Sequence, residues 1–305
     1  MRIAVNGSSG FVGNHVVKEL IDQGHGVVSI VRNESNPRDV EFLESVGAQV
    51  EKLDLAGRDS RLIHVLKDCE GLVHLIGSIA PKRGETFDSL HVGMGRYFFE
   101  SAKEAGVSRV VMVTALGAGE HAPSMYHRTK WLAEEELRRS GLGHVILRPS
   151  LIVGRKVGHR DSKLVRRYLN LIETKSKVPL ALGGKNKVQP VFVGDVAKAI
   201  AASFARDDLL GKTLELAGSE VTTMRGFVET LMDVVGKKRP TRSIPRLLAY
   251  LVASVAELAQ EVPIISRDQV KIAQMDGVTE HNALAEEFEM TPTPLRGALR
   301  CYAGT

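Results

Sequence analysis

A tyrosine and a lysine four positions apart are the residues of this sequence best suited to chemistry. Tyr126 and Lys130 stand in the string YHRTK. Side chains at i and i+4 share one face of a helix. The ammonium can therefore lie beside the phenol, lower its pKa and hold a ribose, while the phenol transfers a proton. This spacing occurs often by chance, so the surrounding elements must support the interpretation.

Thr114 is the third candidate, because it follows the apolar run 109–113, which is typical of a buried strand. Its hydroxyl is suited to polarising a substrate carbonyl. A strand-end hydroxyl that caps a turn would look the same in the sequence, and that alternative stays open.

A glycine-rich string, GSSGFVG, follows the apolar run 2–5 and precedes a helical pattern over residues 12–23. Gly7 permits a sharp turn, Gly10 lets the backbone approach a pyrophosphate, and Gly13 lets the helix pack closely on the sheet. The helix N-terminus then offers N–H groups to phosphates. The sequence predicts a nicotinamide dinucleotide here; a glycine-rich turn without a ligand is the alternative.

The end of the next strand distinguishes NAD from NADP. An acidic residue there would bind the ribose 2′-hydroxyl, but this chain has Arg32. A guanidinium matches a 2′-phosphate through paired, charge-assisted hydrogen bonds. We therefore expect NADP, with NAD as the alternative if Arg32 is only a surface residue.

The elements around these residues alternate between strands and helices, which predicts a Rossmann-type α/β fold with a doubly wound parallel sheet. Strands are expected at residues 2–5, 26–31, 49–53, 71–75, 109–113 and 144–147, and helices at 12–23, 61–67, 95–105 and 124–139. Later come a strand at 191–193, a helix at 195–204 and a strand at 213–216. We expect a dinucleotide-binding domain at 1–150 and 191–214, and a smaller, mainly helical substrate region at 151–190 and 215–305.

Composition limits the function. A formal net charge of +5 is too small for a dedicated nucleic-acid binder and suits an anionic small molecule or an acidic membrane surface. Cys69, Cys301, His91 and His127 have no metal-ligand spacing, so no metal site is expected. We see no signal peptide and no transmembrane pattern, which predicts a cytoplasmic protein with membrane-peripheral contact as an alternative. Oligomeric state is not predicted.

Two segments beyond the first half bear on partners. Residues 155–187 hold ten Lys or Arg and two acids, which suits a bound diphosphate, although an ordinary solvated face is the preferred interpretation. Residues 247–259 form an apolar helical pattern. We expect this helix to pack on the C-terminal region, with a position in a lipid interface as the alternative.

Several strings resemble the atypical short-chain dehydrogenases/reductases, an extended branch of that superfamily, over nearly the whole chain. They are VVMVTALGA (110–118), YHRTKWLAEEEL (126–137), LRPSLIVG (147–154), QPVFVGDVAKAI (189–200), PIISRDQV (263–270) and TPTPLRGAL (291–299). The GxxGxxG spacing of the glycine string is similar to that superfamily too. Within it, the sequence most resembles the branch of the NADPH-binding accessory subunit of respiratory complex I and its bacterial relatives of epimerase/dehydratase type.

The resemblance implies a Tyr–Lys pair with a hydroxyl partner, here Thr114 in place of serine. It also implies further cofactor contacts, namely Ser9, Phe11, Val12, Asp54, Leu55, Gly77, Lys130, Pro149 and Ser150. Asp54 would bind the adenine edge, although a helix N-cap would look alike. Pro149 and Ser150 would pass over the nicotinamide.

Members of the branch include epimerases, dehydratases and a subunit that holds its nucleotide structurally. Because Tyr126 and Lys130 are present, we favour an NADP(H)-dependent oxidoreductase or epimerase acting on a small substrate. A nucleotide-binding accessory or assembly protein at a respiratory membrane is the alternative. A redox sensor without chemistry is less favoured, since such relatives usually lack the YxxxK pair.

Overall fold

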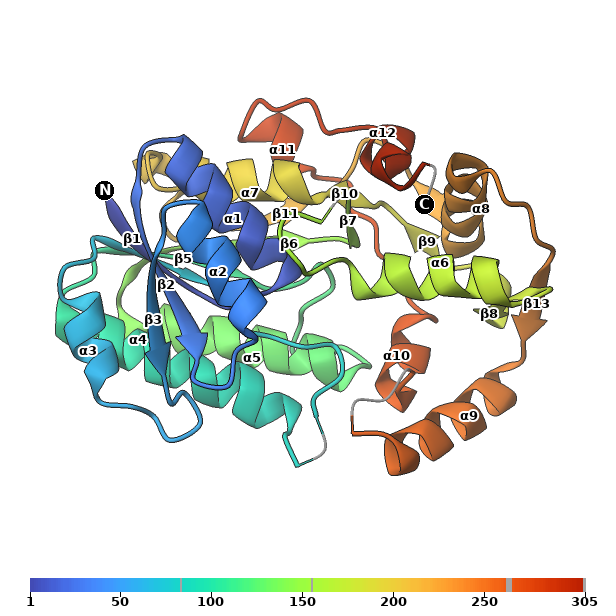
Figure 1. The fold of residues 1–305 in the computed structure, drawn as a ribbon, viewed down its shortest axis with the longest axis horizontal. Coiled ribbons are helices and arrows are strands. Elements are labelled where there is room, and N and C mark those ends of the chain that lie inside the picture. The colour runs from blue at the N-terminus through green and yellow to red at the C-terminus, as the bar shows by residue number, and fades with distance from the viewer. Residues whose placement is uncertain (83, 155, 262–264, 304–305) are drawn as a thin grey trace.

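The computed structural model describes all residues except 83, 155, 262–264 and 304–305. Arg155, which opens the basic stretch, and the first two residues of the string PIISRDQV therefore lie outside the described part. A seven-stranded parallel sheet in the order β3-β2-β1-β4-β5-β6-β11 forms the centre of the molecule (Figure 1). The strands are β1 (Arg2–Asn6), β2 (Gly26–Arg32), β3 (Gln49–Leu53), β4 (Gly71–His74), β5 (Arg109–Val113), β6 (Gly143–Pro149) and β11 (Thr213–Leu216).

Helices cover both faces of this sheet. On one face lie α1 (Phe11–Asp22), α2 (Pro37–Ser45), α7 (Val193–Ala202) and α11 (Ala283–Glu286); on the other lie α3 (Arg61–Leu66), α4 (Met94–Ala105) and α5 (Met125–Ser140). The predicted Rossmann-type fold is confirmed. The sequence analysis missed α2, although Asn36 caps its N-terminus by accepting from the Arg38 amide at 3.0 Å, and Pro37 occupies its first turn.

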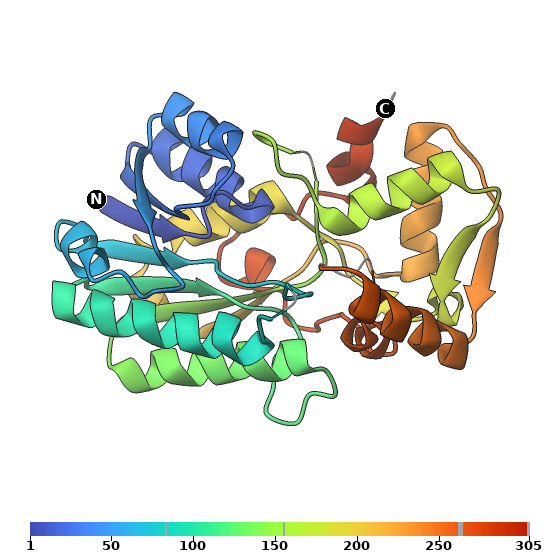
Figure 2. The same ribbon diagram turned by 60° about the horizontal axis from the view of Figure 1, so that its bottom comes forward.

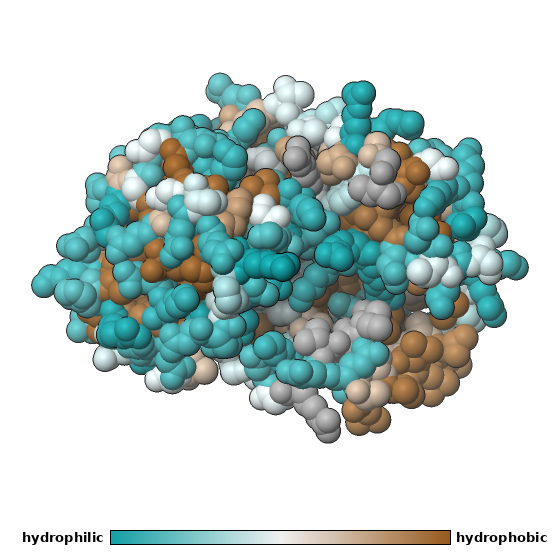
Figure 3. Space-filling model, viewed as in Figure 1, coloured by the Kyte–Doolittle hydropathy of each residue, from teal (hydrophilic) through white to brown (hydrophobic). Residues whose placement is uncertain are grey.

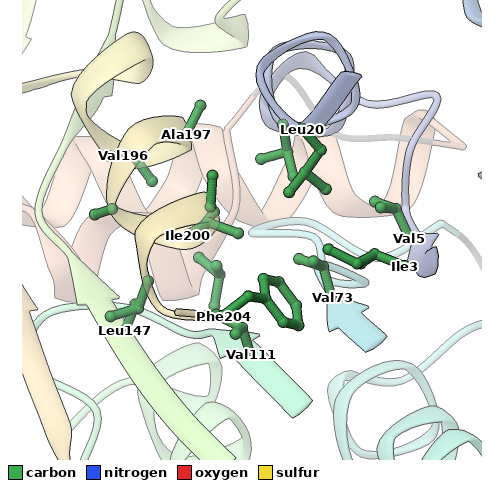
Figure 4. Packing of buried hydrophobic residues seen from close by; sticks show 14 of the residues in the cluster. Ile3, Val5, Leu20, Val73, Val111, Leu147, Val196, Ala197, Ile200 and Phe204 are labelled. Carbon is green, nitrogen blue, oxygen red and sulfur yellow. The ribbon is translucent and has the colours of Figure 1, made fainter. Parts of the chain in front are cut away.

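Two apolar layers hold the helices to the sheet. In Figure 4, Leu20 of α1 and Val196 and Ile200 of α7 pack onto strand residues such as Val5 and Val73. The opposite layer contains Phe98 and Phe99 of α4, both nearly inaccessible to solvent. Burial of one such side chain contributes about 1.5–3 kcal/mol. These layers keep the strand ends, and the loops that follow them, in fixed positions.

The smaller region has its own apolar cluster, which includes Tyr168, Phe227 and Leu299. Its elements are β7 (Ile152–Val153), α6 (Lys163–Thr174), β8 (Val178–Ala181), η2 (Leu182–Gly184), β9 (Lys187–Val188), β12 (Thr222–Thr223), α8 (Met224–Val235), β13 (Thr241–Ile244), α9 (Arg246–Ala259), α10 (Arg267–Ile272), α12 (Leu295–Leu299) and η4 (Arg300–Tyr302). β10 (Val191–Phe192) pairs with β7 and begins the segment that returns to the dinucleotide-binding domain. The π-helical turn η1 (Ser89–Gly93) and the 3-10 turn η3 (Asp207–Leu209) also belong to that domain. β13 pairs with β8 and leads directly into α9. We propose the same division between domains as the sequence suggested.

The apolar helix packs on α10 of the C-terminal region, as expected, but most of its large aliphatic residues take no part in that contact. Only Ala249 and Ala253 of α9 are buried, and its leucines and valines point to solvent. Figures 1 and 2 both place α9 at an outer corner of the molecule, beside α10. Within the described residues, no helix is both long and apolar enough to cross a membrane.

Candidate nucleotide and catalytic site

All predicted site residues follow the carboxyl ends of the parallel strands, and so they meet along one edge of the sheet. The strand order reverses between β1 and β4, which opens a crevice at that edge where dinucleotides bind in doubly wound folds. The glycine string follows β1 and Gly77 follows β4, on the two sides of this crevice.

A buried hydrogen-bond pair that the sequence analysis missed fixes the floor of the crevice. The Asn6 side-chain amide lies 2.8 Å from His74 Nδ1, and Asn6 Oδ1 accepts from the Leu75 amide at 2.9 Å. Because the Asn6 amide nitrogen donates, Nδ1 of His74 is the accepting nitrogen. Burial lowers the pKa of His74 to about 3, so the ring is neutral. An asparagine directly before the glycine string was the available signal.

The glycine string forms a tight cradle for a pyrophosphate. Gly7 has a φ of +67°, which favours glycine, and a Cβ there would lie 3.2 Å from Leu75. A Cβ on Gly13 would lie 2.3 Å from the Gly7 carbonyl oxygen, so only glycine lets α1 approach the loop this closely. Gly10 is the N-cap of α1 and makes no side-chain cap.

This geometry fits the cofactor implied by the fold. The first turn of α1 carries N–H groups that no side chain caps, beside the partly buried Ser9, Phe11 and Val12. An uncapped helix N-terminus at a glycine turn binds phosphate through its N–H groups and its positive dipole end. These residues would hold the diphosphate of a bound dinucleotide.

The adenosine end of the crevice is open and charged. Arg32 ends β2 with its side chain about half exposed, and its Nε lies 3.5 Å from the Glu34 carboxylate. Asp54 follows β3 and accepts from the Gly57 amide at 2.9 Å, so it closes a turn of its own loop. Asp54 does not cap α3, since Ser60 stands at that N-cap position. Leu55 is buried beneath them.

Lys130 is buried where the ends of β4 and β5 come together. Its Nζ donates to the carbonyl oxygens of Ile76, at 3.2 Å, and Val113, at 3.4 Å. A Cβ on Gly77 would lie 2.5 Å from the same Nζ, so the missing side chain leaves the ammonium room. Burial lowers the pKa of Lys130 to about 8, opposed by the charge of Glu134.

Tyr126 lies one turn before Lys130 on α5, among aromatic rings. Its ring centroid is 5.6 Å from that of His91 and 6.3 Å from that of Phe87. Burial raises the pKa of Tyr126 to about 12, and no effect of Lys130 opposes it. The expected lowering of this pKa by the ammonium is therefore not seen, and Tyr126 is a neutral phenol at physiological pH.

His91 links the loop after β4 to the helix that carries the Tyr–Lys pair. Its Nε2 accepts from the Ser78 amide at 3.3 Å, and its Nδ1 lies 2.8 Å from Thr129 Oγ1. Since Nε2 accepts, Nδ1 carries the proton and donates to Thr129. Burial lowers the pKa of His91 to about 2. His91 is thus a neutral structural residue, as is the buried His127, which lies 2.7 Å from Ser124.

The expected role of Thr114 requires correction. Its hydroxyl donates at 2.7 Å to Glu134, a carboxylate with no exposed side-chain surface. Arg148 and Arg138 bind the same carboxylate, with Arg148 Nη2 at 2.6 Å from Glu134 Oε2. Because a hydroxyl has a single proton, Thr114 has none left for polarising a carbonyl. Thr114 is a structural hydroxyl at the strand end, but it binds a carboxylate on α5 and does not cap a turn as the alternative interpretation expected.

Pro149 and Ser150 complete the edge at the end of β6. Ser150 donates its amide to the Leu216 carbonyl at 2.8 Å and its hydroxyl to the Gln189 carbonyl. These bonds fix the chain where it leaves β6 for the smaller region. A contact of these two residues with the nicotinamide stays a prediction.

Asp268, on α10, is a site residue that the sequence analysis missed. Its carboxylate accepts from the backbone amides of Met125, at 2.8 Å, and Tyr126, at 3.0 Å. A carboxylate at a helix N-terminus satisfies free N–H groups and the helix dipole. The two residues are distant in sequence, so no local pattern could have shown this contact.

Three residues of the basic stretch bind or line surfaces other than the predicted site. Arg160 binds the buried Asp39 of α2, with Nη2 at 2.6 Å from Oδ2. Lys156 and Arg166 line a hollow of about 1010 Å³ beside α6, and none of the predicted site residues lines it. In the described part of the chain, no group of three or more His, Cys, Asp or Glu side chains is placed to hold a metal ion.

The chain is similar in sequence and fold to several known proteins. The chain is 28% identical, over 96% of its length and 75% of the relative's, to the mitochondrial NADH dehydrogenase [ubiquinone] 1 alpha subcomplex subunit 9 of Arabidopsis thaliana. It is 28% identical to the ceramide reductase of Caulobacter vibrioides, over 68% of this chain and 62% of that one. The structure of the NADPH-dependent quinone oxidoreductase QOR2 of Escherichia coli complexed with NADPH matches with a TM-score of 0.75 at 22% identity, over 97% and 98% of the two chains.

A family model described as NAD(P)H-binding matches residues 7–168, more than half of the chain. The match contains the glycine string, Arg32, Gly77, and the Tyr126–Lys130 pair. The chain therefore belongs to the NAD(P)H-binding family, as an extended member of the short-chain dehydrogenase/reductase type with NAD(P)H as its cofactor.

Proposed function

We propose that the protein is an NADP(H)-dependent oxidoreductase or epimerase that acts at a carbonyl or hydroxyl carbon of a small, anionic or lipid-like substrate. The observation that carries this proposal is the placement of Lys130. Its ammonium is buried between the ends of β4 and β5, under Gly77, one helical turn from Tyr126. Burying an amine costs stability, and a buried amine with a shifted pKa at a crevice is a typical sign of a functional site.

Each residue has a role that follows from its surroundings. Lys130 would hold the nicotinamide ribose through its ammonium. Tyr126, a phenol with a raised pKa, would donate its proton to the substrate oxygen when a carbonyl is reduced. When bound, NADPH would supply the hydride for the carbonyl carbon, which together with the proton from Tyr126 would give an alcohol. Thr114 and Glu134 would act as positioning residues that fix α5 against β5 and β6.

Arg32 supports a preference for NADP over NAD. Its guanidinium is exposed at the end of β2, where the ribose of the adenosine would lie. The remaining predicted contacts, from Ser9, Phe11, Val12, Asp54, Leu55, Gly77, Pro149 and Ser150, belong to this proposal.

The test is a screen of carbonyl compounds, including long-chain ketones and quinones, with NADPH oxidation as the readout. We expect one class to be reduced, and Tyr126→Phe to lower kcat by roughly 10²–10⁴-fold while NADPH still binds. Thr129→Ser, on the same helix, is the matched control. If Tyr126→Phe is as active as the parent, the proposed mechanism is wrong.

A second candidate function is supported by one observation, the similarity over 96% of the chain to a subunit named for NADH dehydrogenase. In that case the protein would be a non-catalytic, nucleotide-binding accessory or assembly protein of a respiratory membrane complex. Retained NADPH with no turnover on any carbonyl would favour it. Either function is compatible with the cytoplasmic location that we propose, with membrane-peripheral contact as the alternative.

A further inference from the structure

The outer face of α9 is an exposed apolar surface that the proposed chemistry leaves unused. Six aliphatic side chains on this helix are exposed, from 43% for Leu248 to 80% for Leu247. The set is Leu247, Leu248, Leu251, Val252, Val255 and Leu258, which we call the α9 face. Figure 3 shows it as a continuous hydrophobic patch over the corner that α9 occupies in Figure 1.

The spacing of these residues places their side chains on one side of α9. They recur at intervals of one, three and four positions, which places them along one side of an α-helix. The opposite side is anchored through Ala249 and Ala253 to a small cluster with Val270 and Ile244. Small residues thus attach the helix to the protein, whereas the large aliphatic residues face outward, the reverse of an ordinary surface helix.

Charge at the N-terminal end of the face favours an anionic surface. The only acid in α9, Glu257, is bound by Arg267 on α10, with 2.6 Å between Oε2 and Nε. Arg242 on β13 and Arg246, whose guanidinium lies 5.7 Å from the Tyr250 ring centroid, are exposed at the N-terminal end. Lys185, exposed after η2, lies near the same end because β8 pairs with β13.

The composition of the face favours lipid over protein as its partner. Protein interfaces are enriched in aromatic residues, Met and Arg, and carry regular hydrogen bonds, while Leu and Val are rare among their energetic centres. The α9 face contains only Leu and Val. Ser254, the only hydroxyl residue of the helix besides Tyr250, already donates to the Tyr250 carbonyl at 2.9 Å. Such a helix with basic residues at one end is typical of insertion at the level of the headgroups.

We propose that the α9 face docks the protein onto an anionic lipid bilayer. The leucines and valines enter the boundary between headgroups and acyl chains, and Arg242, Arg246 and Lys185 contact the headgroup phosphates. A hollow of about 370 Å³ lies between residues 80–82 and 84–88, Met125 and the end of α9. Phe87 lines this hollow and its ring centroid lies 6.3 Å from that of Tyr126, so docking would place the bilayer on the side of the molecule that carries Tyr126.

Flotation of the full-length protein tests this proposal without any need for catalysis. Vesicles of phosphatidylcholine alone are compared with an equimolar mixture with phosphatidylglycerol. We expect the protein to float with the anionic vesicles and less with the neutral ones. Leu251→Glu and Val255→Glu should each weaken binding at least about tenfold, and the double variant Arg242→Gln, Arg246→Gln should abolish the preference for phosphatidylglycerol.

Val221→Glu is the matched control, since Val221 is 55% exposed but lies outside α9. It should float like the parent, and every variant should still bind NADPH, which shows that it is folded. A protein that stays at the bottom of the gradient, or Glu variants that float unchanged, would overturn the proposal. A lipid-free dimer that Leu251→Glu dissociates would overturn it too, because the face would then bind a second copy.

Discussion

The carboxylate of Asp268 accepts the backbone amide of Tyr126 at 3.0 Å, so the C-terminal region caps the helix that carries the candidate acid. Asp268 sits on α10, which packs on α9. Through this contact the smaller region holds the N-terminus of α5 in place. The Tyr–Lys pair is therefore positioned by both parts of the molecule, and the helix with the exposed apolar face is one element away from it.

Replacing Asp268 by alanine should lower the free energy of unfolding by about 1–2 kcal/mol, because the amides of Met125 and Tyr126 lose their charged acceptor, while Ser124 remains the N-cap. Asp268→Asn should lose less, since an amide oxygen still accepts. Urea denaturation measures both. Glu261→Gln, an exposed acid near α10, is the control and should change stability by less than about 0.5 kcal/mol. Equal stabilities for Asp268→Ala and the parent would show that the cap is unimportant.

Nucleotide affinity should fall as the pH rises through about 8. Burial lowers the pKa of Lys130 to about 8, so the ammonium that would hold the ribose is lost above that pH, by about tenfold per pH unit. The free energy of unfolding should instead rise with pH over the same range. The unfolded lysine, with a pKa of about 10.4, binds more protons than the folded one between pH 8 and 10.4, so this group favours folding increasingly across that window.

Fluorescence titration with NADPH from neutral to alkaline pH measures this change. Lys130→Arg serves as the control, because a guanidinium stays charged throughout, and its affinity should not decline near pH 8. A parent affinity that is constant across the range would exclude Lys130 from nucleotide binding.

Arg32→Glu should reverse the preference between nucleotides. The guanidinium at the end of β2 is available to a 2′-phosphate, and a charge-assisted contact of this kind is worth about 1.5–3 kcal/mol, or roughly tenfold or more in affinity. NADPH binding should fall by that factor while NADH binding changes little. Parallel titrations of both nucleotides measure it, with Arg38→Glu as a control on the exposed start of α2. If the two nucleotides bind equally to the parent, Arg32 does not select between them.

Thr114→Val should affect stability more than catalysis. Removing the hydroxyl leaves the buried Glu134 with one donor fewer, which costs about 1–3 kcal/mol. The catalytic rate should change by less than about threefold, because Tyr126 and Lys130 are untouched. Thr114→Ser restores the donor and should recover the stability. A loss of rate comparable to that of Tyr126→Phe, with stability unchanged, would show that Thr114 takes part in the chemical step.

Local patterns were sufficient for most of the fold. Alternation of apolar runs with helical segments predicted the strands of the parallel sheet. This worked because the spacing of buried residues in a strand or a helix is visible within a short stretch of sequence. The spacing of Gly7, Gly10 and Gly13 predicted the loop between β1 and α1 for the same reason. One turn and the start of one helix determine the conformation of this loop. Helix α2 was missed, although Asn36 and Pro37 are a local signal for the start of a helix.

Contacts between distant segments were decided only by the tertiary structure. The sequence placed a hydroxyl at 114, but the packing of α5 against β5 directs it to Glu134. Asn6 with His74 and Asp268 with Tyr126 join residues far apart in the chain. Burial lowers the pKa of Lys130 and raises that of Tyr126, because it disfavours the charged form of each group. That burial also depends on contacts between distant segments. The apolar pattern of residues 247–259 was also visible in the sequence, but which face of α9 meets solvent followed from how it packs.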